Sequence, residues 1–240
     1  MLVFACLSPH PPLILPTVGS PVDRQKVKKT IQSLESLAPK LKKASPDLII
    51  ISSPHPDWGT KVPLHFLMDN ARLLARQEKW KMDNYFSADL IGNSKLEIGN
   101  FAVLPILTTL DSPQQHFDWG KKLALKIPKE RRLAWIASGD MSHRLKEDGP
   151  YGFDPAGPKF DQEFIKLLKR KDIQGILNID PDLVERAGEC GLRSFCMLLG
   201  ALEASKVKWQ PEILSYEGPF GVGYLVANIQ INTNKNNPNE

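Results

Sequence analysis

The sequence predicts a single-domain α/β protein with a largely parallel or mixed central sheet and helices on both faces. Three observations predict this class: short apolar runs recur along the chain, amphipathic patterns of helical period separate them, and no linker divides the 240 residues. Strands that alternate with helices are typical of a parallel sheet covered on both sides. We expect one domain over residues 1–232 and a polar C-terminal tail at 233–240.

Each expected element follows from a local pattern. Apolar runs predict buried strands at 2–7, 47–52, 101–107 and 133–138. Helical patterns predict helices at 22–44, 113–127, 159–177 and 192–205. Residues 56–100 are more irregular, and a last strand pair is expected at 211–216 and 222–231. The helix at 22–44 carries apolar residues three or four apart, so its many Lys and Arg side chains form a solvated face.

Composition narrows the functional classes. Hydrophobic residues make up 42%, charged residues 24%, and the net charge is +4, which is ordinary for a soluble globular protein. The three cysteines lack C-x-x-C spacing, which argues for a reducing compartment and against a disulfide framework. The N-terminus lacks a signal peptide's basic region, and no apolar run reaches 18 residues. We therefore expect a cytoplasmic protein without a membrane or nucleic-acid partner.

The tetrapeptide Ser-Pro-His-Pro occurs twice, at 8–11 and 53–56, each time directly after an expected strand. A third histidine, His143, follows the strand at 133–138 through the turn GDMSH. Ligands of open α/β sheets bind outside the carboxyl ends of the strands, so we expect His10, His55 and His143 to converge on one cleft. The prolines that flank His10 and His55 restrict the backbone and fix the direction of each imidazole, which suits a metal ligand. We interpret the repeat as one local geometry used twice.

A metal site needs a third ligand beside His10 and His55. Two histidines and one carboxylate form the facial triad of non-haem Fe(II) oxygenases, and the same set can hold a catalytic zinc. Glu189 is the first carboxylate candidate, because it lies between two glycines just ahead of an apolar helix. From the residues alone, a helix-capping role for Glu189 is equally open. Cys190 is a rival ligand, and Glu217 is the second carboxylate candidate.

His143 has a setting of its own, between Ser142 and Arg144 in SGDMSHRL. A serine-hydrolase triad is disfavoured, because neighbouring Ser142 and His143 cannot easily pair and the G-x-S-x-G elbow is missing. A general acid/base role fits better, since histidine titrates near neutral pH. The glycine- and proline-rich stretches at 149–161 and 215–227 predict shaped loops near the same cleft. Of the remaining histidines, His65 has no such setting and is expected to be a packed or surface residue. His116, in a Pro-Gln-Gln stretch just before a helix, is an outside candidate only.

Several motifs, taken in order, resemble one family: SPHPPLILPTVG, SSPH, SGDMSHRL, FD, ECG and YEGPFGVGYLVA. Together they resemble the LigB-like superfamily of class III extradiol ring-cleavage dioxygenases, over nearly the whole chain. The chain looks closest to compact members near the Memo-like/AmmeMemoRadiSam group. Matched motif by motif, the resemblance implies that His10, His55 and Glu189 are the metal ligands and that His143 is the catalytic acid/base.

The resemblance implies an Fe(II) enzyme that uses O2 to open the ring of a small catechol- or aminophenol-like aromatic, with zinc as the alternative metal. It also implies a homodimer. Two alternatives stay open. In the Memo branch a cysteine replaces the carboxylate, so Cys190 favours a metal-binding or redox protein without ring-cleaving turnover, with a radical-SAM system as partner. A zinc-dependent hydrolase would use the same ligands.

Overall fold

The computed structural model describes residues 1–68, 96–98 and 101–232. Seven strands form one sheet in the order β3-β4-β2-β5-β1-β7-β6. Their bounds are β1 Leu2–Ser8, β2 Leu48–Ser53, β3 Leu96–Ile98, β4 Phe101–Leu107, β5 Leu133–Ser138, β6 Lys208–Glu217 and β7 Tyr224–Asn232. The helices are η1 Pro12–Ile14, α1 Pro21–Lys26, α2 Lys28–Ala44, α3 Trp58–Leu67, α5 Pro113–Lys126, α6 Ala156–Arg170, α7 Ile173–Leu177, α8 Pro181–Ala187 and α9 Leu192–Ser205.

The sheet is mixed, with a parallel centre and antiparallel edges. Strands β4, β2, β5 and β1 run parallel, whereas β7 and β6 close one side antiparallel and β3 pairs antiparallel with β4 on the other. This confirms the expected largely parallel or mixed sheet. Because β5 lies between β1 and β2, the loops that leave these three strands emerge side by side at the carboxyl edge.

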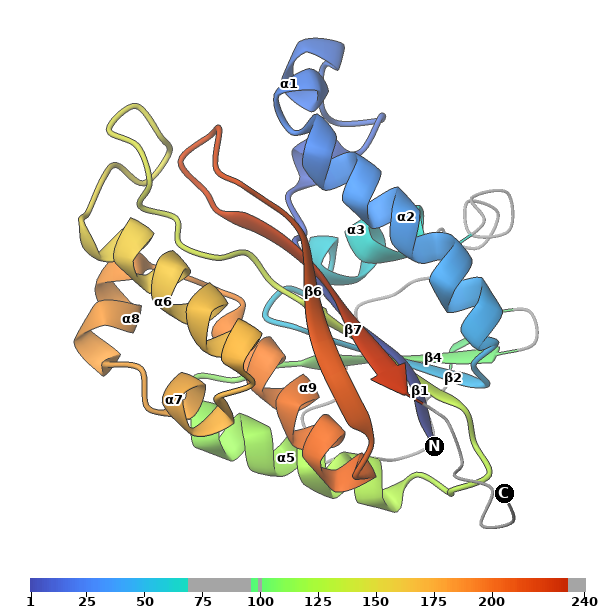
Figure 1. The fold of residues 1–240 in the computed structure, drawn as a ribbon. Helices are drawn as coiled ribbons and strands as arrows, with labels where there is room; N and C mark the ends of the chain where they lie inside the picture. Colours follow the sequence, from blue (N-terminus) through green and yellow to red (C-terminus); the bar gives the residue numbers. More distant parts are fainter. Residues whose placement is uncertain (69–95, 99–100, 233–240) are drawn as a thin grey trace.

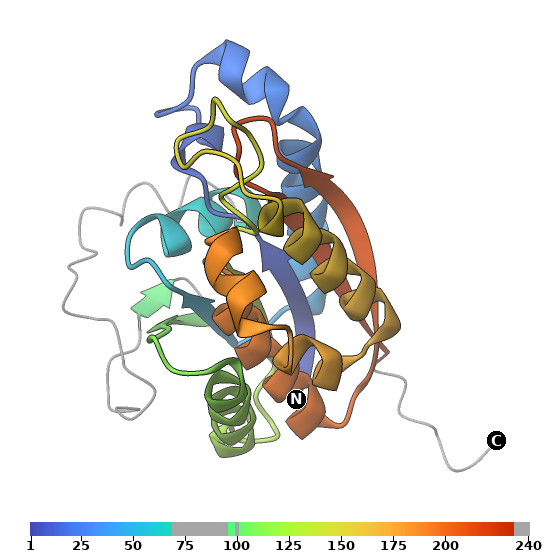
Figure 2. The same cartoon turned by 90° about the vertical axis from the view of Figure 1, so that its left-hand side faces the viewer.

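The strand side chains alternate between two hydrophobic layers. In β5, Leu133, Trp135 and Ala137 point into one layer, and Ala134 and Ile136 point into the other. Helices α5, α6 and α9 cover the first face of the sheet, and α2 and α3 cover the second (Figures 1 and 2). The expectation of helices on both faces is therefore confirmed.

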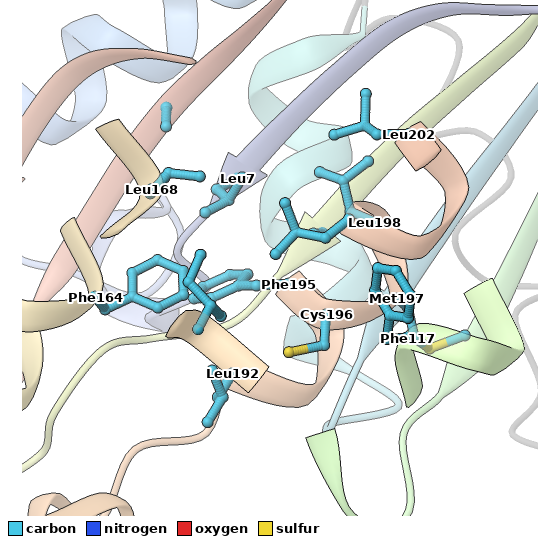
Figure 3. Close-up of a cluster of buried hydrophobic side chains, with 14 of the residues drawn as sticks. Leu7, Phe117, Phe164, Leu168, Leu192, Phe195, Cys196, Met197, Leu198 and Leu202 are labelled. Atoms are coloured by element: carbon cyan, nitrogen blue, oxygen red, sulfur yellow. The ribbon is translucent and has the colours of Figure 1, made fainter. Parts of the chain in front are cut away.

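Helix α9 is the main helix of the larger layer. Figure 3 shows Phe195 of α9 beside Phe164 of α6, and both belong with Leu7 of β1 to the larger hydrophobic layer. A helix that buries nearly all of its side chains is held in place by packing on several sides. The N-terminus of α9 is consequently fixed against the sheet.

Two helices expected as continuous are each divided in the structure. The pattern at 22–44 forms α1 and α2, which meet at Val27, where the backbone leaves helical geometry. The pattern at 159–177 forms α6 and α7, because Lys171 adopts a left-handed conformation (φ 57°) that ends α6. Apolar spacing continued across both breaks and so concealed them.

The other elements agree with expectation or add to it. The strands β1, β2, β4, β5 and β7 match the expected positions, and β6 extends the expected 211–216 to Lys208–Glu217. Helix α3 lies in the stretch expected to be irregular, and the short helix α8 was not expected. Most of the remainder of 56–100, like the tail at 233–240, lies outside the described residues. Among the helices that the structure describes, none has the length and apolarity needed to cross a membrane.

Candidate metal centre

The two Ser-Pro-His-Pro loops flank the loop that follows β5. Strands β1 and β5 end in register at Ser8 and Ser138, and β2 ends on the other side of β5. The imidazole rings of His10 and His55 contact each other beside the end of β5, with ring centroids 5.0 Å apart in an edge-to-face arrangement. The repeated tetrapeptide therefore brings two imidazoles to one point at the carboxyl edge of the sheet.

His10 is held as a neutral imidazole whose Nε2 faces the other candidate ligands. Its side chain is buried, and its Nδ1 lies 3.0 Å from Ser138 Oγ, which leaves Nε2 facing the centre. Burial, and secondarily the nearby His55, lowers the pKa of His10 to about 3. A neutral ring oriented through its other nitrogen is the usual state of a metal-ligating histidine.

The two loops are nevertheless held by different hydrogen bonds. The main-chain amide of His10 donates to Asp140 Oδ1 at 2.9 Å, across the sheet edge. The amide of His55 donates to Ser53 Oγ at 3.2 Å, within its own loop, and His55 is exposed where His10 is buried. The interpretation as one geometry used twice thus holds for the ring positions but not for the bonds that hold them.

Cys190 supplies the third potential ligand atom at this point. One ligand atom each from His10, His55 and Cys190 lie within 4.8 Å of one another, and Cys190 Sγ is 3.5 Å from His10 Nε2. Burial, and then the carboxylates of Asp140 and Glu189, raise the pKa of the Cys190 thiol well above its ordinary value. A metal ion would replace that proton, since only the thiolate ligates.

A close backbone contact brings Cys190 to the sheet edge. A Cβ atom built on Gly139 would lie 2.2 Å from the Cα of Gly191, so these two chain segments approach as only glycine allows. The amide of Gly191 donates to the carbonyl of Asp140 at 2.9 Å, and the amide of Asp140 donates to Cys190 Sγ at 3.3 Å. These hydrogen bonds hold the segment before α9 against the end of β5.

Glu189, expected as the carboxylate ligand, lies at the N-terminus of α9. Its Oε2 accepts the Leu192 amide at 2.5 Å, its Oε1 lies 4.0 Å from Arg193 Nη1, and its side chain is 1% exposed. Burial raises the pKa of Glu189 to about 7. This is the capping role that the sequence left open, and the carboxylate belongs to neither group of metal-ligand atoms that the described residues form.

A second group of ligand atoms, from Asp140, His143 and Cys190, adjoins the first and shares its sulfur. Asp140 is buried, which raises the pKa of its carboxyl to about 6. His143 stacks on Tyr151 with ring centroids 5.1 Å apart, and burial lowers its pKa. Its Nε2 is buried and has no hydrogen-bond partner within the part of the chain that the structure describes. Among the described residues, His143 thus presents an unpaired nitrogen beside the candidate ligand atoms.

The two glycine-rich stretches lie beside the centre, as their composition indicated. The amide of Met141 donates to Gly223 O and the amide of Gly223 donates to Ser142 O, each at 2.8 Å. Leu145 pairs with Phe153 as an isolated antiparallel bridge, which folds the 149–161 stretch back over the loop. Both stretches therefore fix the backbone that carries His143.

The remaining candidates have structural roles away from the centre. Glu217 Oε2 accepts the amide and the hydroxyl of Thr30, each at 2.8 Å, and so caps the first turn of α2. His116 is buried at the start of α5, with Nδ1 2.9 Å from Ser112 O and Nε2 accepting the Thr109 amide at 3.1 Å. His65 lies on α3, edge-on to the ring of its neighbour Phe66.

Sequence reasoning missed residues that support the centre without belonging to its ligands. Ser138 looked like the last residue of an apolar strand, and Tyr151 like part of a turn-rich loop. A polar residue that ends an otherwise apolar strand was the available signal for Ser138. No local pattern distinguishes Tyr151, because its contact with His143 depends on the fold of the loop.

The donor set fits a transition metal. Two imidazoles and a thiol that can ligate as a thiolate, with a carboxylate close by, form a site suited to iron and to zinc alike. Nδ1 of His10 is already hydrogen-bonded to Ser138, so the ring needs no rearrangement to ligate through Nε2. Nε2 of His143 is buried without a hydrogen-bond partner among the described residues, so it could accept a proton from a group bound there.

Comparison with known proteins identifies the family to which the chain belongs. Residues 55–227 match the family described as the catalytic LigB subunit of aromatic ring-opening dioxygenase, and the chain belongs to this family. The chain is 34% identical to Protein CA_C1420 of Clostridium acetobutylicum over 274 aligned positions. This alignment covers 95% of the chain but only 57% of the relative's length.

A solved structure shares the fold. The crystal structure of Escherichia coli K12 protein JW3007 covers 95% of this chain and 100% of its own, with a TM-score of 0.52 and 14% sequence identity. At that identity the likeness concerns the fold alone. The family match places the protein in a superfamily of dioxygenase-type enzymes, which usually use a metal.

Proposed function

We propose that the protein is a non-haem Fe(II)-dependent extradiol dioxygenase that opens the ring of a catechol- or aminophenol-like aromatic. The observation that carries this proposal is the unpaired Nε2 of His143 beside the His10–His55–Cys190 cluster in the described residues. Ring opening of a diol needs a metal site and a base next to it. Family membership supports the reaction class, and the geometry supports the division of roles.

His10, His55 and Cys190 are the proposed metal ligands. An iron held by these residues would supply the Lewis-acid and redox chemistry that the reaction of the aromatic with O2 requires. Buried His10 fixes one side of the centre, whereas exposed His55 borders the side from which a substrate can enter. Glu189 could replace Cys190 as a ligand only by leaving the α9 terminus, where its carboxylate accepts the Leu192 amide.

His143 is the proposed general base and acid. Burial keeps its imidazole neutral, so Nε2 can accept the proton of a substrate hydroxyl. The neighbouring carboxylate of Asp140 favours the imidazolium that results, and the stacked ring of Tyr151 holds the imidazole plane. His143 then returns the proton as the ring opens. Both oxygen atoms of O2 enter the product, a muconic semialdehyde-type compound with the composition of substrate plus O2.

A reconstitution assay tests the proposal. The protein is loaded with Fe(II) without oxygen, bound iron is quantified, and a panel of catechols and aminophenols is added with O2. We expect yellow ring-fission products, with one O2 consumed for each product molecule. Iron bound at one ion per chain, with no oxygen uptake on any of these compounds, would contradict the proposal.

One observation favours a second candidate function, a metal-binding or redox protein without ring-cleaving turnover. The third donor within reach of the two histidines is a thiol rather than a carboxylate. A thiolate donor changes the redox potential of iron and favours copper as well. A reversible potential with full metal loading and no turnover in the same assay would support this candidate.

A further inference from the structure

Helix α6 buries a carboxylate that the proposed chemistry does not use. Asp161 is 0% exposed, and it follows Phe160 on the face of α6 that packs against the core. Its Oδ1 accepts the amide of Ser142 at 2.8 Å, and its Oδ2 accepts the hydroxyl of Tyr216 at 2.5 Å. No lysine, arginine or histidine nitrogen of the described residues lies within salt-bridge distance of Asp161. The carboxylate is therefore satisfied by hydrogen bonds rather than by a cation.

The Ser142 amide belongs to the peptide segment that carries His143. The neighbouring amides are also bonded: that of Asp140 to Cys190 Sγ, that of His143 to Ala187 O at 3.1 Å, and that of Leu145 to Gly221 O at 3.0 Å. Asp161, on helix α6, is the carboxylate among the acceptors that bind the amides of this segment. Its bond fixes the backbone one residue before His143.

The position of His143 Nε2 depends on that backbone. This nitrogen has no hydrogen bond to any residue that the structure describes, so the ring is placed by its main chain and by the stack on Tyr151. Tyr151 is 52% exposed and lies on a loop, and so it gives weaker support than the buried helix α6. A catalytic group needs to be held to within a fraction of an ångström by residues around it.

We propose that Asp161 and Tyr216 are positioning residues for His143, acting through the Ser142 amide. This inference rests on the proposed role of His143 as the general acid/base. Tyr216 OH orients the Asp161 carboxylate, and Asp161 holds the Ser142 peptide. Neither side chain needs to touch the substrate or the metal. Burial raises the pKa of Asp161 to about 6, because the ionised carboxylate loses contact with water.

Three variants test the proposal in the iron-loaded protein. Asp161→Ala removes both hydrogen bonds, and we expect kcat to fall by about 100-fold, with KM and bound iron unchanged. Asp161→Asn keeps an oxygen for the Ser142 amide and should recover most of the activity. Tyr216→Phe removes only the hydroxyl, keeps the Ser142 bond, and should lower kcat by about 3- to 10-fold. If Asp161→Ala does not fold, the effect of the smaller change in Tyr216→Phe on kcat still tests the proposal.

A matched control separates positioning from a general loss of stability. Asp172 accepts the Gly175 amide at 2.8 Å at the start of α7, just as Asp161 accepts an amide at 2.8 Å. Asp172→Ala should lower thermal stability and leave kcat unchanged. If Asp161→Ala and Asp172→Ala lower kcat equally, or if Asp161→Ala keeps the wild-type kcat, the proposal is overturned.

A spectroscopic readout does not depend on turnover. In the zinc-loaded protein with ¹³C-labelled histidine, we expect one sharp ring signal for His143 in the wild type. The Asp161→Ala signal should be broadened or doubled, while those of His65 and His116 are unchanged. A wild-type-like His143 signal in Asp161→Ala would refute the positioning role. Altered His143 signals in a protein that turns over no catechol would support positioning and refute the dioxygenase.

Discussion

Cys190 and Glu189 are adjacent in the sequence but have different surroundings in the fold. Cys190 Sγ faces His10 Nε2 at 3.5 Å, whereas the Glu189 carboxylate turns toward the first amides of α9. Backbone geometry explains this, since the side chains of adjacent residues leave the main chain in different directions. In this structure, Cys190 is the one of the two whose ligand atom lies beside the imidazoles.

Substitutions at these two positions distinguish the third ligand. We expect Cys190→Ser to weaken iron and zinc binding by about 100-fold or more, because a ligand is lost. For comparison, loss of a side chain that only orients a ligand lowers metal affinity by about 10- to 100-fold. Glu189→Gln should leave metal affinity nearly unchanged, because the Glu189 carboxylate accepts the Leu192 amide and is not one of the atoms beside the imidazoles. Anaerobic metal titration measures both. The reverse order of effects would identify Glu189 as the ligand.

Burial of Asp161 makes stability depend on pH in an unusual direction. Its pKa is about 6 in the folded protein, above the ordinary value of 3.8. Between about pH 4 and pH 6, the Asp161 carboxyl stays protonated in the folded protein and is ionised in the unfolded chain. The contribution of Asp161 to the free energy of unfolding is therefore full below about pH 4 and is lost as the pH rises through about 6.

Replacement of Asp161 by asparagine removes this titration. Relative to wild type, Asp161→Asn should gain unfolding free energy on the order of 2–3 kcal/mol between pH 4 and pH 7, since one pKa unit corresponds to about 1.4 kcal/mol. Urea unfolding across this range measures the difference. Asp172→Asn, which changes an exposed carboxylate, is the control. Wild-type and Asp161→Asn curves that stay parallel would show that Asp161 does not titrate in this way.

At the scale of elements, the centre depends on how closely the segment before α9 approaches the end of β5. Gly139 and Gly191 permit this approach, and the hydrogen bonds around Asp140 hold it. The same approach brings the sulfur of Cys190 toward His10. Metal affinity should therefore depend on a glycine that contributes no ligand atom.

Gly139→Ala tests this dependence. A methyl group there would lie 2.2 Å from the Cα of Gly191, so the two backbones must separate. We expect a loss of unfolding free energy of about 2 kcal/mol or more, together with weaker metal binding. Gly152→Ala is the control: its new methyl meets open space, and only its positive φ of 73° costs stability. Equal metal affinity in the two variants would disprove the role of the Gly139–Gly191 contact.

Local patterns predicted most of the fold and part of the site. Apolar runs located most strands of the sheet, and strand ends located His10, His55 and His143. The breaks at Val27 and Lys171 escaped prediction because apolar spacing continues through them. The support given by Ser138, Tyr151 and Asp161 could not be predicted, because those contacts join residues that only the tertiary fold brings together.

At the scale of the whole molecule, a bound metal would join the ends of separate elements. His10 follows β1, His55 follows β2, and Cys190 precedes α9. A ligand that binds only the folded state adds about 2.7 kcal/mol of stability at 100 times its Kd. For a chain of this size that corresponds to a rise in Tm of about 5–10 °C.

Thermal unfolding with and without metal tests this linkage. Zn(II) or anaerobic Fe(II) should raise the Tm of the wild type, and a chelator should reverse the rise. His10→Ala should show no rise under the same conditions. A shift of equal size in His10→Ala would mean that the metal acts at another place.

The central proposal is that the paired Ser-Pro-His-Pro loops hold a metal and that His143 stands beside it as the acid/base. Anaerobic iron titration of the wild type beside His10→Ala, His55→Ala and His143→Ala tests it most directly. We predict one iron per chain for the wild type and for His143→Ala, none for the other two, and loss of catechol turnover in His143→Ala. Loss of iron in His143→Ala, or full loading of His10→Ala and His55→Ala, would contradict it.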